Sequence, residues 1–373
     1  MTEIYLIRHT QAEGNVYRAM QGHWDGDVTA LGLRQIDALA ERFRGVKVDA
    51  LYSSDLKRAM LTADAIRRFR PMELHTLFDL REINVGPWEA RFFADILYEQ
   101  PAETELFLRR AAEFSLPGAE SYADVRRRAV AALENIAEEN EGKTVAVVSH
   151  GVTILCLLSH MLGLPMDDPK LPICGNTGVN HLFYENGVFR VESVNDCAHL
   201  EGLDLPDWRR TPALRAESFS PAEEAAFYIA CYADAWRAAH GTAEGFEGET
   251  YLAAAAEHHR AEGEAVLRFF DGEERVGLLD LDPRRGAHAN YGWVSLLYLD
   301  GTRRGQGLGV QLLGRALMFY RRRGRAAVRL QVAEDNAAAL RFYEKHGFRR
   351  LSSERGRFGK LYLMEYRFGE SHV

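Results

Sequence analysis

The chain of 373 residues lacks most features that mark secreted, membrane or nucleic-acid-binding proteins. Its four cysteines form no Cys-x-x-Cys pair, which favours reduced thiols over a disulfide framework. The net charge of −8 leaves no basic excess for general nucleic-acid binding. Strand-like sequence begins at Glu3, which leaves no room for a signal peptide. We therefore expect a cytoplasmic protein that binds neither nucleic acid nor membranes; its oligomeric state stays open.

Long hydrophobic runs are also scarce. The most apolar stretch, 145–158, is interrupted by Ser149, His150 and Gly151, so it predicts a buried strand followed by a helix rather than a membrane span. The length indicates two or three domains. Residues 201–212 show no periodicity and contain two prolines, which is typical of a linker. We predict one domain over 1–205, a linker over 206–215 and a second domain over 216–373.

The first half alternates between predicted strands and helices. Apolar runs predict strands over 3–8, 48–52, 143–149, 179–184 and 188–194. Helical periodicity predicts helices over 29–44, 56–69, 120–140 and 150–162, with caps at Thr29 and at 53–55. Because the strands are apolar throughout and are joined by helices, the sequence predicts an α/β sheet covered on both faces.

Charged residues follow two of these apolar strands. Arg8 and His9 end the first, and His150 ends the strand at 143–149. The carboxyl ends of strands in an open α/β sheet are where ligands bind. A neutral histidine can accept a phosphoryl group, arginine forks clamp phosphate oxygens, and a carboxylic acid protonates the leaving oxygen. We predict His9 as nucleophile, Arg8, Arg58 and His150 as phosphate ligands, and Glu82 as the acid.

These residues resemble the motifs of the histidine phosphatase superfamily, which includes the cofactor-dependent phosphoglycerate mutases, over roughly residues 1–200. The matching segments are Arg8-His9, Asn15, Gln21-Gly22, 54–59, 117–121 and 149–151. The resemblance implies a three-layer α/β/α fold with a mostly parallel sheet, and a phosphohistidine on His9 formed without a cofactor. It also implies substrate contacts from Asn15, Gln21 and Gly22.

Two positions depart from the family pattern. Thr10 stands where glycine is common, and Ala12 stands where serine or threonine is common, so one phosphate contact is expected to be missing. Mutases of the family carry a longer insertion between the acid and the second histidine than the segment between Glu82 and His150. We therefore predict hydrolysis of a small-molecule phosphomonoester, with phosphoglycerate mutase-type phosphoryl transfer as the alternative.

The second half contains a glycine-rich loop, 304–309, between a strand at 291–299 and an amphipathic helix. Free N–H groups and the dipole at a helix N-terminus bind pyrophosphate, and glycines let the ligand approach the backbone. The loop lacks the Gly-Lys-Ser/Thr of a P-loop, and no acidic residue follows at the distance of a dinucleotide fingerprint. The loop alone therefore leaves the ligand open.

The next segment narrows the choice. Residues 328–332 predict a strand, and a helix follows in which Asn336 and Tyr343 lie two turns apart on one face. Over 213–368 this resembles the GNAT acyl-CoA N-acyltransferases, which implies a mixed-sheet α/β fold, acetyl-CoA as cofactor and an amine as acceptor. Tyr343 would then protonate the departing thiolate. The cofactor contacts implied are Leu297, Leu299, Arg304, Gly305, Gln306, Gly307, Leu308, Gly309 and Asn336.

One chemical group is missing from this second set. Many GNAT enzymes carry a carboxylate on the strand before the loop, and 291–299 has none, so Asp280 and Asp282 are possible substitutes and the base stays unassigned. No metal-ligand spacing is present, and neither mechanism requires a metal. We predict a bifunctional phosphatase and N-acetyltransferase. The alternatives are an active phosphatase with a non-catalytic CoA-binding module, the mutase, and a scaffold with two inactive sites.

Overall fold

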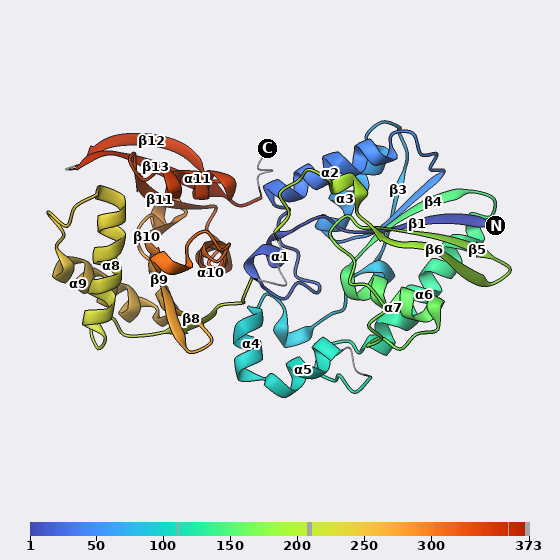
Figure 1. Cartoon of the computed structure of the whole chain (residues 1–373), viewed down its shortest axis with the longest axis horizontal. Helices are drawn as coiled ribbons and strands as arrows, with labels where there is room; N and C mark the ends of the chain where they lie inside the picture. The colour runs from blue at the N-terminus through green and yellow to red at the C-terminus, as the bar shows by residue number, and fades with distance from the viewer. Residues whose placement is uncertain (110–111, 207–210, 357, 370–373) are drawn as a thin grey trace. The chain divides into compact units, whose positions relative to one another are not determined.

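The computed structural model describes residues 1–109, 112–206, 211–356 and 358–369. The chain forms two compact units (Figure 1). One contains Met1–Asn15 and Ala19–Leu205, and the other contains Val16–Arg18 and the chain from Pro206 onward. Each unit has its own sheet and helices, and each is considered by itself below. Among the described helices, none combines the length and hydropathy needed to cross a bilayer.

The described part of the first unit is built on a six-stranded sheet in the order β3-β2-β4-β1-β5-β6. Strands β1, β4, β2 and β3 run parallel to one another, and β5 and β6 are antiparallel additions at the β1 edge. The predicted mostly parallel sheet is therefore confirmed. The strands are β1 (Thr2–Arg8), β2 (Ala50–Ser54), β3 (Leu74–Leu77), β4 (Thr144–Ser149), β5 (Val179–Glu185) and β6 (Val188–Asp196).

The helices of this unit begin at local capping signals in two cases. Thr29 caps α2 by accepting a hydrogen bond from Gly32, and Ser121 and Asp124 form a capping box at α6. The expected cap at 53–55 is wrong, because α3 begins after Leu56 without a side-chain cap. The helices are α1 (Glu13–Tyr17), α2 (Ala30–Phe43), α3 (Lys57–Arg67), α4 (Phe93–Glu99), α5 (Pro101–Arg109), α6 (Tyr122–Glu139) and α7 (Gly151–Leu162), with short 3-10 turns η1 (Phe78–Leu80), η2 (Gly86–Trp88) and η3 (Ala198–Leu200).

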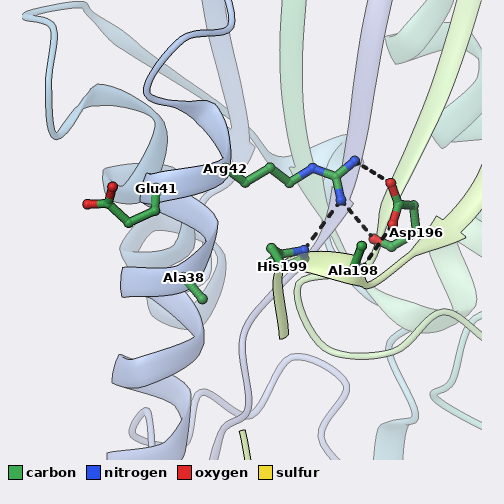
Figure 2. Close-up of a pocket in the computed structure, with 6 residues that line it drawn as sticks. All are labelled: Ala38, Glu41, Arg42, Asp196, Ala198 and His199. Carbon is green, nitrogen blue, oxygen red and sulfur yellow. Dashed lines mark hydrogen bonds and ion pairs between the residues drawn. The ribbon is translucent and has the colours of Figure 1, made fainter. Parts of the chain in front are cut away.

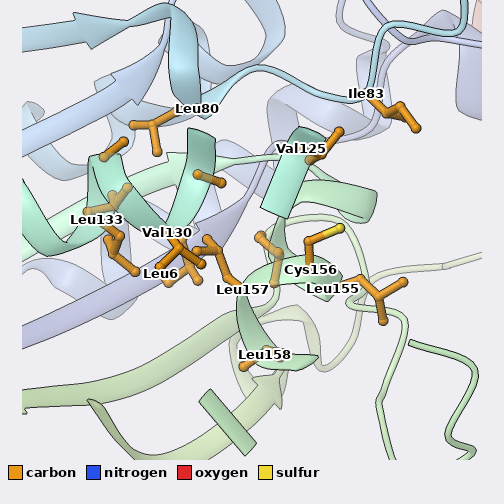
Figure 3. Packing of buried hydrophobic residues seen from close by; sticks show 14 of the residues in the cluster. Leu6, Leu80, Ile83, Val125, Val130, Leu133, Leu155, Cys156, Leu157 and Leu158 are labelled. Carbon is orange, nitrogen blue, oxygen red and sulfur yellow. The ribbon is translucent and has the colours of Figure 1, made fainter. Parts of the chain in front are cut away.

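Buried side chains cover both faces of this sheet. Because neighbouring residues of a strand point to opposite faces, Leu6 packs with α6 and α7, whereas Ile7 packs with α2 and α3. Figure 3 shows the first of these cores, where Leu6 lies with Leu133 and Leu157. Fully burying a leucine contributes about 1.5–3 kcal/mol. The ends of the strands are therefore fixed by close packing on both faces of the sheet.

The second unit contains, in its described residues, a seven-stranded sheet in the order β12-β13-β11-β10-β9-β8-β7. Strands β10 and β11 are parallel and the other described pairs are antiparallel, which confirms the predicted mixed sheet. The strands are β7 (Arg215–Ser218), β8 (Val266–Asp271), β9 (Glu274–Asp282), β10 (Tyr291–Leu299), β11 (Ala327–Ala333), β12 (Arg349–Gly356) and β13 (Gly359–Arg367).

Helices cover the two faces of this sheet differently. Leu278 and Leu296 pack with Tyr228 of α8, so α8 and α9 lie on one face. A side chain at Gly277 would instead place its Cβ 3.1 Å from Leu312 of α10, which puts α10 on the other face. The helices are α8 (Ala225–His240), α9 (Gly248–Ala261), α10 (Gly309–Arg322) and α11 (Ala337–Lys345), with 3-10 turns η4 (Gly263–Ala265), η5 (Ala287–Ala289) and η6 (Gly301–Arg303).

The parallel pair β10–β11 is short. Its register runs from Tyr291 opposite Ala327 to Trp293 opposite Arg329, and no described pairing continues beyond that point. A bulge between Val294 and Leu296 bends β10 away. The edge of β10 toward β11 is therefore left without a strand partner over its second half.

Candidate active sites

The pairing of β1 with β4 brings the two predicted histidines together. Arg8 lies opposite Ser149 in the parallel register, and the N–H of His9 donates to the Ser149 carbonyl at 2.9 Å. The ring centroids of His9 and His150 are 5.0 Å apart. Both side chains are buried, with His9 only 2% exposed. The adjacent strand ends thus form one closed cluster of charged and titratable groups.

One ring nitrogen of His9 is fixed by the backbone. Its Nδ1 lies 2.6 Å from the Thr10 carbonyl oxygen, which can only accept, so Nδ1 carries the proton and Nε2 holds a lone pair. Burial, reinforced by the charges of Arg58 and Arg8, holds the pKa of His9 well below 6.5. The pKa of His150 is lowered by the same causes. Both rings are therefore neutral near pH 7, and Nε2 of His9 is available as a nucleophile.

Several buried polar atoms of this cluster have no partner. They are Nε of Arg8, Nε of Arg58 and both ring nitrogens of His150. An unsatisfied buried polar atom typically costs about 1–3 kcal/mol, and such groups are rare in folded proteins. Their concentration around one histidine indicates a ligand with several acceptor oxygens, and phosphate has the matching number and charge.

Arg58 enters this cluster from α3 and holds the loop at 21–24. Its two Nη atoms donate to the carbonyl oxygens of Gln21 at 3.0 Å, Gly22 at 2.8 Å and Trp24 at 3.0 Å. A Cβ at Gly22 would lie only 2.4 Å from the Ile83 carbonyl, so the loop packs closely there. The predicted residues Gln21 and Gly22 therefore contact Arg58 through their backbones.

Asn15 lies in α1, which follows the segment that carries His9. Its Oδ1 accepts the Ala12 N–H at 3.0 Å, which leaves its amide nitrogen as the remaining polar group. The unexpected Thr10 is fully buried, and its hydroxyl donates to the Gly32 carbonyl at 2.6 Å. Thr10 thus attaches the segment that carries His9 to α2 instead of facing the cluster.

Glu82 reaches the cluster from the loop after η1. Its carboxylate accepts hydrogen bonds from the N–H groups of Val152 and Thr153, each at 3.1 Å, at the start of α7. A Cβ at Gly151 would lie 3.5 Å from both the Glu82 carboxylate and the Arg8 guanidinium. The structure therefore brings all five residues predicted for phosphoryl chemistry to one place.

Three supporting residues were missed by the sequence reasoning. Glu89 accepts from the N–H groups of His23 at 2.8 Å and Trp24 at 2.6 Å, Arg128 donates to the Glu82 carbonyl at 2.9 Å, and Asn176 donates to the His9 carbonyl at 3.0 Å. Each bonds to the backbone of a distant segment. Their sequence neighbourhoods carry no motif, so no signal in the sequence could have identified them.

A surface hollow of about 420 Å³ lies beside Arg42 and His199 (Figure 2). Arg42 is held there by Asp196 at 2.7 Å, and His199 Nε2 lies 3.0 Å from the hydroxyl of Thr177. The N–H of Thr177 in turn donates to the Arg8 carbonyl at 3.1 Å. These polar groups bond to one another, and through Thr177 they support the end of β1.

In the second unit, the residues predicted for the cofactor surround the start of α10. Gly305 and Gly307 adopt φ angles of +75° and +76°, and a Cβ at either position would meet nothing within 4 Å. Leu308 is buried and precedes α10, and Gly309 is its first residue, packed near Phe342. The side chain of Gln306 folds back onto the Thr302 carbonyl at 2.8 Å. The loop thus presents backbone rather than side chains to its surroundings.

The remaining predicted cofactor residues are placed as follows. Leu297 and Leu299 lie on the part of β10 beyond its pairing with β11. The guanidinium of Arg304 donates to the Leu299 carbonyl at 2.8 Å and pairs with Asp234 at 3.1 Å, so it ties the loop to β10. Asn336 caps α11 by accepting from Ala339. Tyr343 is buried, which raises the pKa of its hydroxyl, and that hydroxyl has no hydrogen bond within the described residues.

Comparison with known proteins agrees with the family resemblance predicted for each half of the chain. The sequence model of the histidine phosphatase superfamily (branch 1) matches residues 4–197, just over half of the chain. The chain therefore belongs to the histidine phosphatase superfamily. The model of the acetyltransferase (GNAT) family matches residues 226–348, so the same chain carries a GNAT domain, a fold class that uses acetyl-CoA.

Individual relatives resemble the first half. The chain is 31% identical over 215 residues to the probable phosphoglycerate mutase GpmB of Proteus mirabilis, covering 56% of this chain and 100% of that protein. It is 29% identical over 215 residues, with the same coverage, to the protein of that name from Salmonella typhi. The solved structure of YhfR from Bacillus stearothermophilus is 31% identical, with a TM-score of 0.52, covering 54% of this chain and 100% of that one.

Proposed function

We propose that the chain is a bifunctional enzyme. Its N-terminal domain, 1–205, hydrolyses a small-molecule phosphomonoester through a phosphohistidine on His9. Its C-terminal domain, 216–373, transfers an acetyl group from acetyl-CoA to an amine. One observation supports the first activity most strongly. Nitrogen atoms of Arg8, Arg58 and His150 without hydrogen-bond partners gather near His9, which is neutral and has one ring nitrogen free.

The first step follows from the positions of these groups. The arginines and His150 hold the phosphate oxygens, and Nε2 of His9 attacks the phosphorus. The N–P bond forms as the ester P–O bond breaks, and the leaving oxygen takes a proton from Glu82. Preorganised donors of this kind usually account for about 10²–10³ in rate each.

The second step releases phosphate. Glu82, now ionised, accepts a proton from a water molecule, whose oxygen attacks the phosphorus as the N–P bond breaks. His9 returns to its neutral state with Nδ1 still bonded to Thr10. Asn15 and the loop at 21–22 are proposed to contact the substrate, the loop through its backbone.

The second activity rests on backbone geometry. The glycine loop before α10 would bind the pyrophosphate of acetyl-CoA, because N–H groups at a helix N-terminus favour anions. The unpaired edge of β10 at Leu297 and Leu299 would bond the pantetheine amides, and Asn336 would lie near the cofactor. Tyr343 would protonate the departing thiolate.

Two observations favour alternatives. The curated relatives named probable phosphoglycerate mutases are matched along their whole length, which supports mutase-type transfer in the first domain. The absence of a carboxylate on Tyr291–Leu299 supports a CoA-binding module without catalysis in the second. Acetyl transfer to any amine would exclude the second alternative.

The test of the first activity is phosphate release from a broad panel of phosphomonoesters, with His9→Ala as control. We expect release by the wild-type protein that is lost in the variant. The same assay with 3-phosphoglycerate and a catalytic amount of bisphosphoglycerate separates the mutase: isomerisation without net phosphate release would overturn hydrolysis. For the second activity, free thiol is measured after mixing acetyl-CoA with a panel of amines.

A further inference from the structure

A chain of acid–base groups lies on the α8–α9 face of the second sheet. His258 of α9 sits between two carboxylates of β9, with Nδ1 2.7 Å from Asp280 and Nε2 3.4 Å from Asp282. On the other side of Asp280, the hydroxyl of Tyr228 donates at 2.7 Å. The groups therefore form a continuous line: Tyr228, Asp280, His258, Asp282.

One end of this line is closed and the other is open. Asp280 is 1% exposed, and a buried carboxylate is stable only when it is well hydrogen-bonded, as it is here by Tyr228 and His258. The side chains of His258 and Asp282 are 13% and 23% exposed. A proton can thus exchange with solvent at the exposed end of the line, which His258 and Asp282 form. Asp280 and Tyr228 fix the orientation of the His258 ring from the buried side.

The line is close to the gap between β10 and β11. Asp280 lies opposite Leu296 in the β9–β10 ladder, just beyond Trp293, where β10 leaves β11. Residues directly opposite in such a ladder have Cβ atoms about 4.5–5.5 Å apart. Since α10 packs on the other face, we take the α8–α9 face as the one open to a second reactant.

That second reactant needs a base. An amine near neutral pH is an ammonium ion and has no lone pair until it loses a proton, and β10 itself carries no carboxylate. We propose that His258 is the general base of acetyl transfer, with Asp280 and Tyr228 as positioning residues. This rests on the acetyltransferase activity proposed above.

The step balances as follows. The ammonium gives one proton to His258, and its lone pair forms the C–N bond at the thioester carbonyl carbon. The C–S bond breaks and the thiolate takes a proton from Tyr343. The nitrogen of the new amide loses its second proton, which restores Tyr343, and His258 passes its proton to water.

The pH dependence follows from the groups around His258. Burial lowers its pKa, but the hydrogen bonds and charges of Asp280 and Asp282 outweigh burial, so the pKa lies above 6.5. His258 therefore accepts a proton only above that raised pKa, and kcat rises with pH through it. The other titratable or charged groups around the line are Tyr232 of α8, Tyr251 and Glu257 of α9, Tyr320 of α10, and Arg284 and Arg285 after β9.

The experiment measures kcat against pH for the full chain with acetyl-CoA and the best amine of the panel. For His258→Gln we expect a loss of about 10²–10⁴-fold in kcat, no acidic limb, and an unchanged KM for acetyl-CoA. Asp280→Asn should keep the limb but move it to lower pH, because the ring loses a negative partner. His259→Gln is the matched control and should behave as wild type, since within the described part of the chain that neighbouring ring bonds only to the Gly263 carbonyl.

Two results would overturn the inference, and they are distinguishable. An active wild type whose kcat and acidic limb survive in His258→Gln removes His258 as the base while leaving acetyl transfer in place. A wild type that binds acetyl-CoA in calorimetry but transfers to no amine removes the activity and the base together. If His258→Gln does not fold, an acidic limb that Asp280→Asn leaves unmoved also overturns it.

Discussion

The two candidate sites are built from different parts of the polypeptide. Around His9, charged side chains from three segments meet in a buried cluster. The evidence for a ligand there is the set of buried polar atoms without hydrogen-bond partners. Around Gly307, the features are backbone: two left-handed glycines, a helix start and a strand edge without a neighbour. Side-chain deletion should therefore damage the first site most, and restriction of the backbone should damage the second.

The largest expected effect comes from removing the nucleophile. We expect His9→Ala to lower phosphate release by at least about 10⁴-fold, because loss of a nucleophile removes the covalent route. Acetyl-CoA binding should stay unchanged. His181→Ala is a suitable control, since His181 lies on β5 and bonds to Glu3 at 2.8 Å. Steady-state phosphate assays and calorimetry check both, and equal losses in the two variants would contradict the role of His9.

Replacing Arg58, which we propose to bind the phosphate oxygens, should have a smaller effect. We expect Arg58→Lys to lower kcat/KM for hydrolysis by about 10²–10³-fold, because lysine keeps the charge but lacks the fork that reaches phosphate and the carbonyls of 21–24. Arg67→Lys on the same helix, where Arg67 pairs with exposed Asp64, is the control. Activity within twofold of wild type in Arg58→Lys would mean that charge alone suffices.

The corresponding test of the second site changes backbone freedom. A side chain is disfavoured at the φ of +76° seen at Gly307, by about 1–3 kcal/mol. We expect Gly307→Ala to weaken acetyl-CoA binding about tenfold in calorimetry, with phosphate release unchanged. Gly324 has a φ of +66° and equally open surroundings at the end of α10, so Gly324→Ala carries similar strain away from the loop. Equal weakening by both variants would show general destabilisation instead.

The last expected effect concerns folding, and it is a difference in acid stability between the two units. His9 and His150 have pKa values well below 6.5, so the unfolded chain binds protons that the folded first unit does not. Its stability should be complete above pH 6.5 and fall below it, by up to about 1.4 kcal/mol per pH unit for each histidine.

In the second unit the histidine contributions partly cancel, because the raised pKa of His258 opposes the lowered pKa values of His240 and His346. The pKa of His346 is lowered to about 4, but that of His258 is raised, so His258 stabilises below pH 6.5 and loses that contribution as the pH rises through its folded pKa. Hydrogen exchange followed by mass spectrometry between pH 7 and pH 4 resolves the two units. Protection that falls less steeply in the first unit than in the second would contradict this difference.

Much of the fold could be predicted from the sequence because the strands carry uninterrupted apolar runs. The strand ends at Arg8 and Ser149 were visible because charge follows such a run abruptly. The cap at 53–55 was predicted wrongly because serine and aspartate also bond within turns, and Ser54 accepts from Leu56 there.

The parts that could not be predicted depend on contacts between distant segments. Glu89 binds the backbone at 23–24, and Asp280 and Asp282 enclose His258 only after α9 has packed on β9. No local periodicity records such pairings, since each partner alone is an ordinary polar residue. The residues proposed to carry the chemistry were therefore easier to predict than those that hold them in place.

In the proposed mechanism, the bond between Nδ1 of His9 and the Thr10 carbonyl would determine which phosphohistidine isomer forms. With Nδ1 occupied, phosphorus is attached to Nε2, the nitrogen flanked by two C–H groups. A phosphoryl group there couples in NMR to both carbon-bound ring protons, whereas one on Nδ1 has a single such neighbour. The trapped intermediate, kept alkaline because N–P bonds hydrolyse in acid, should thus show two phosphorus–proton correlations.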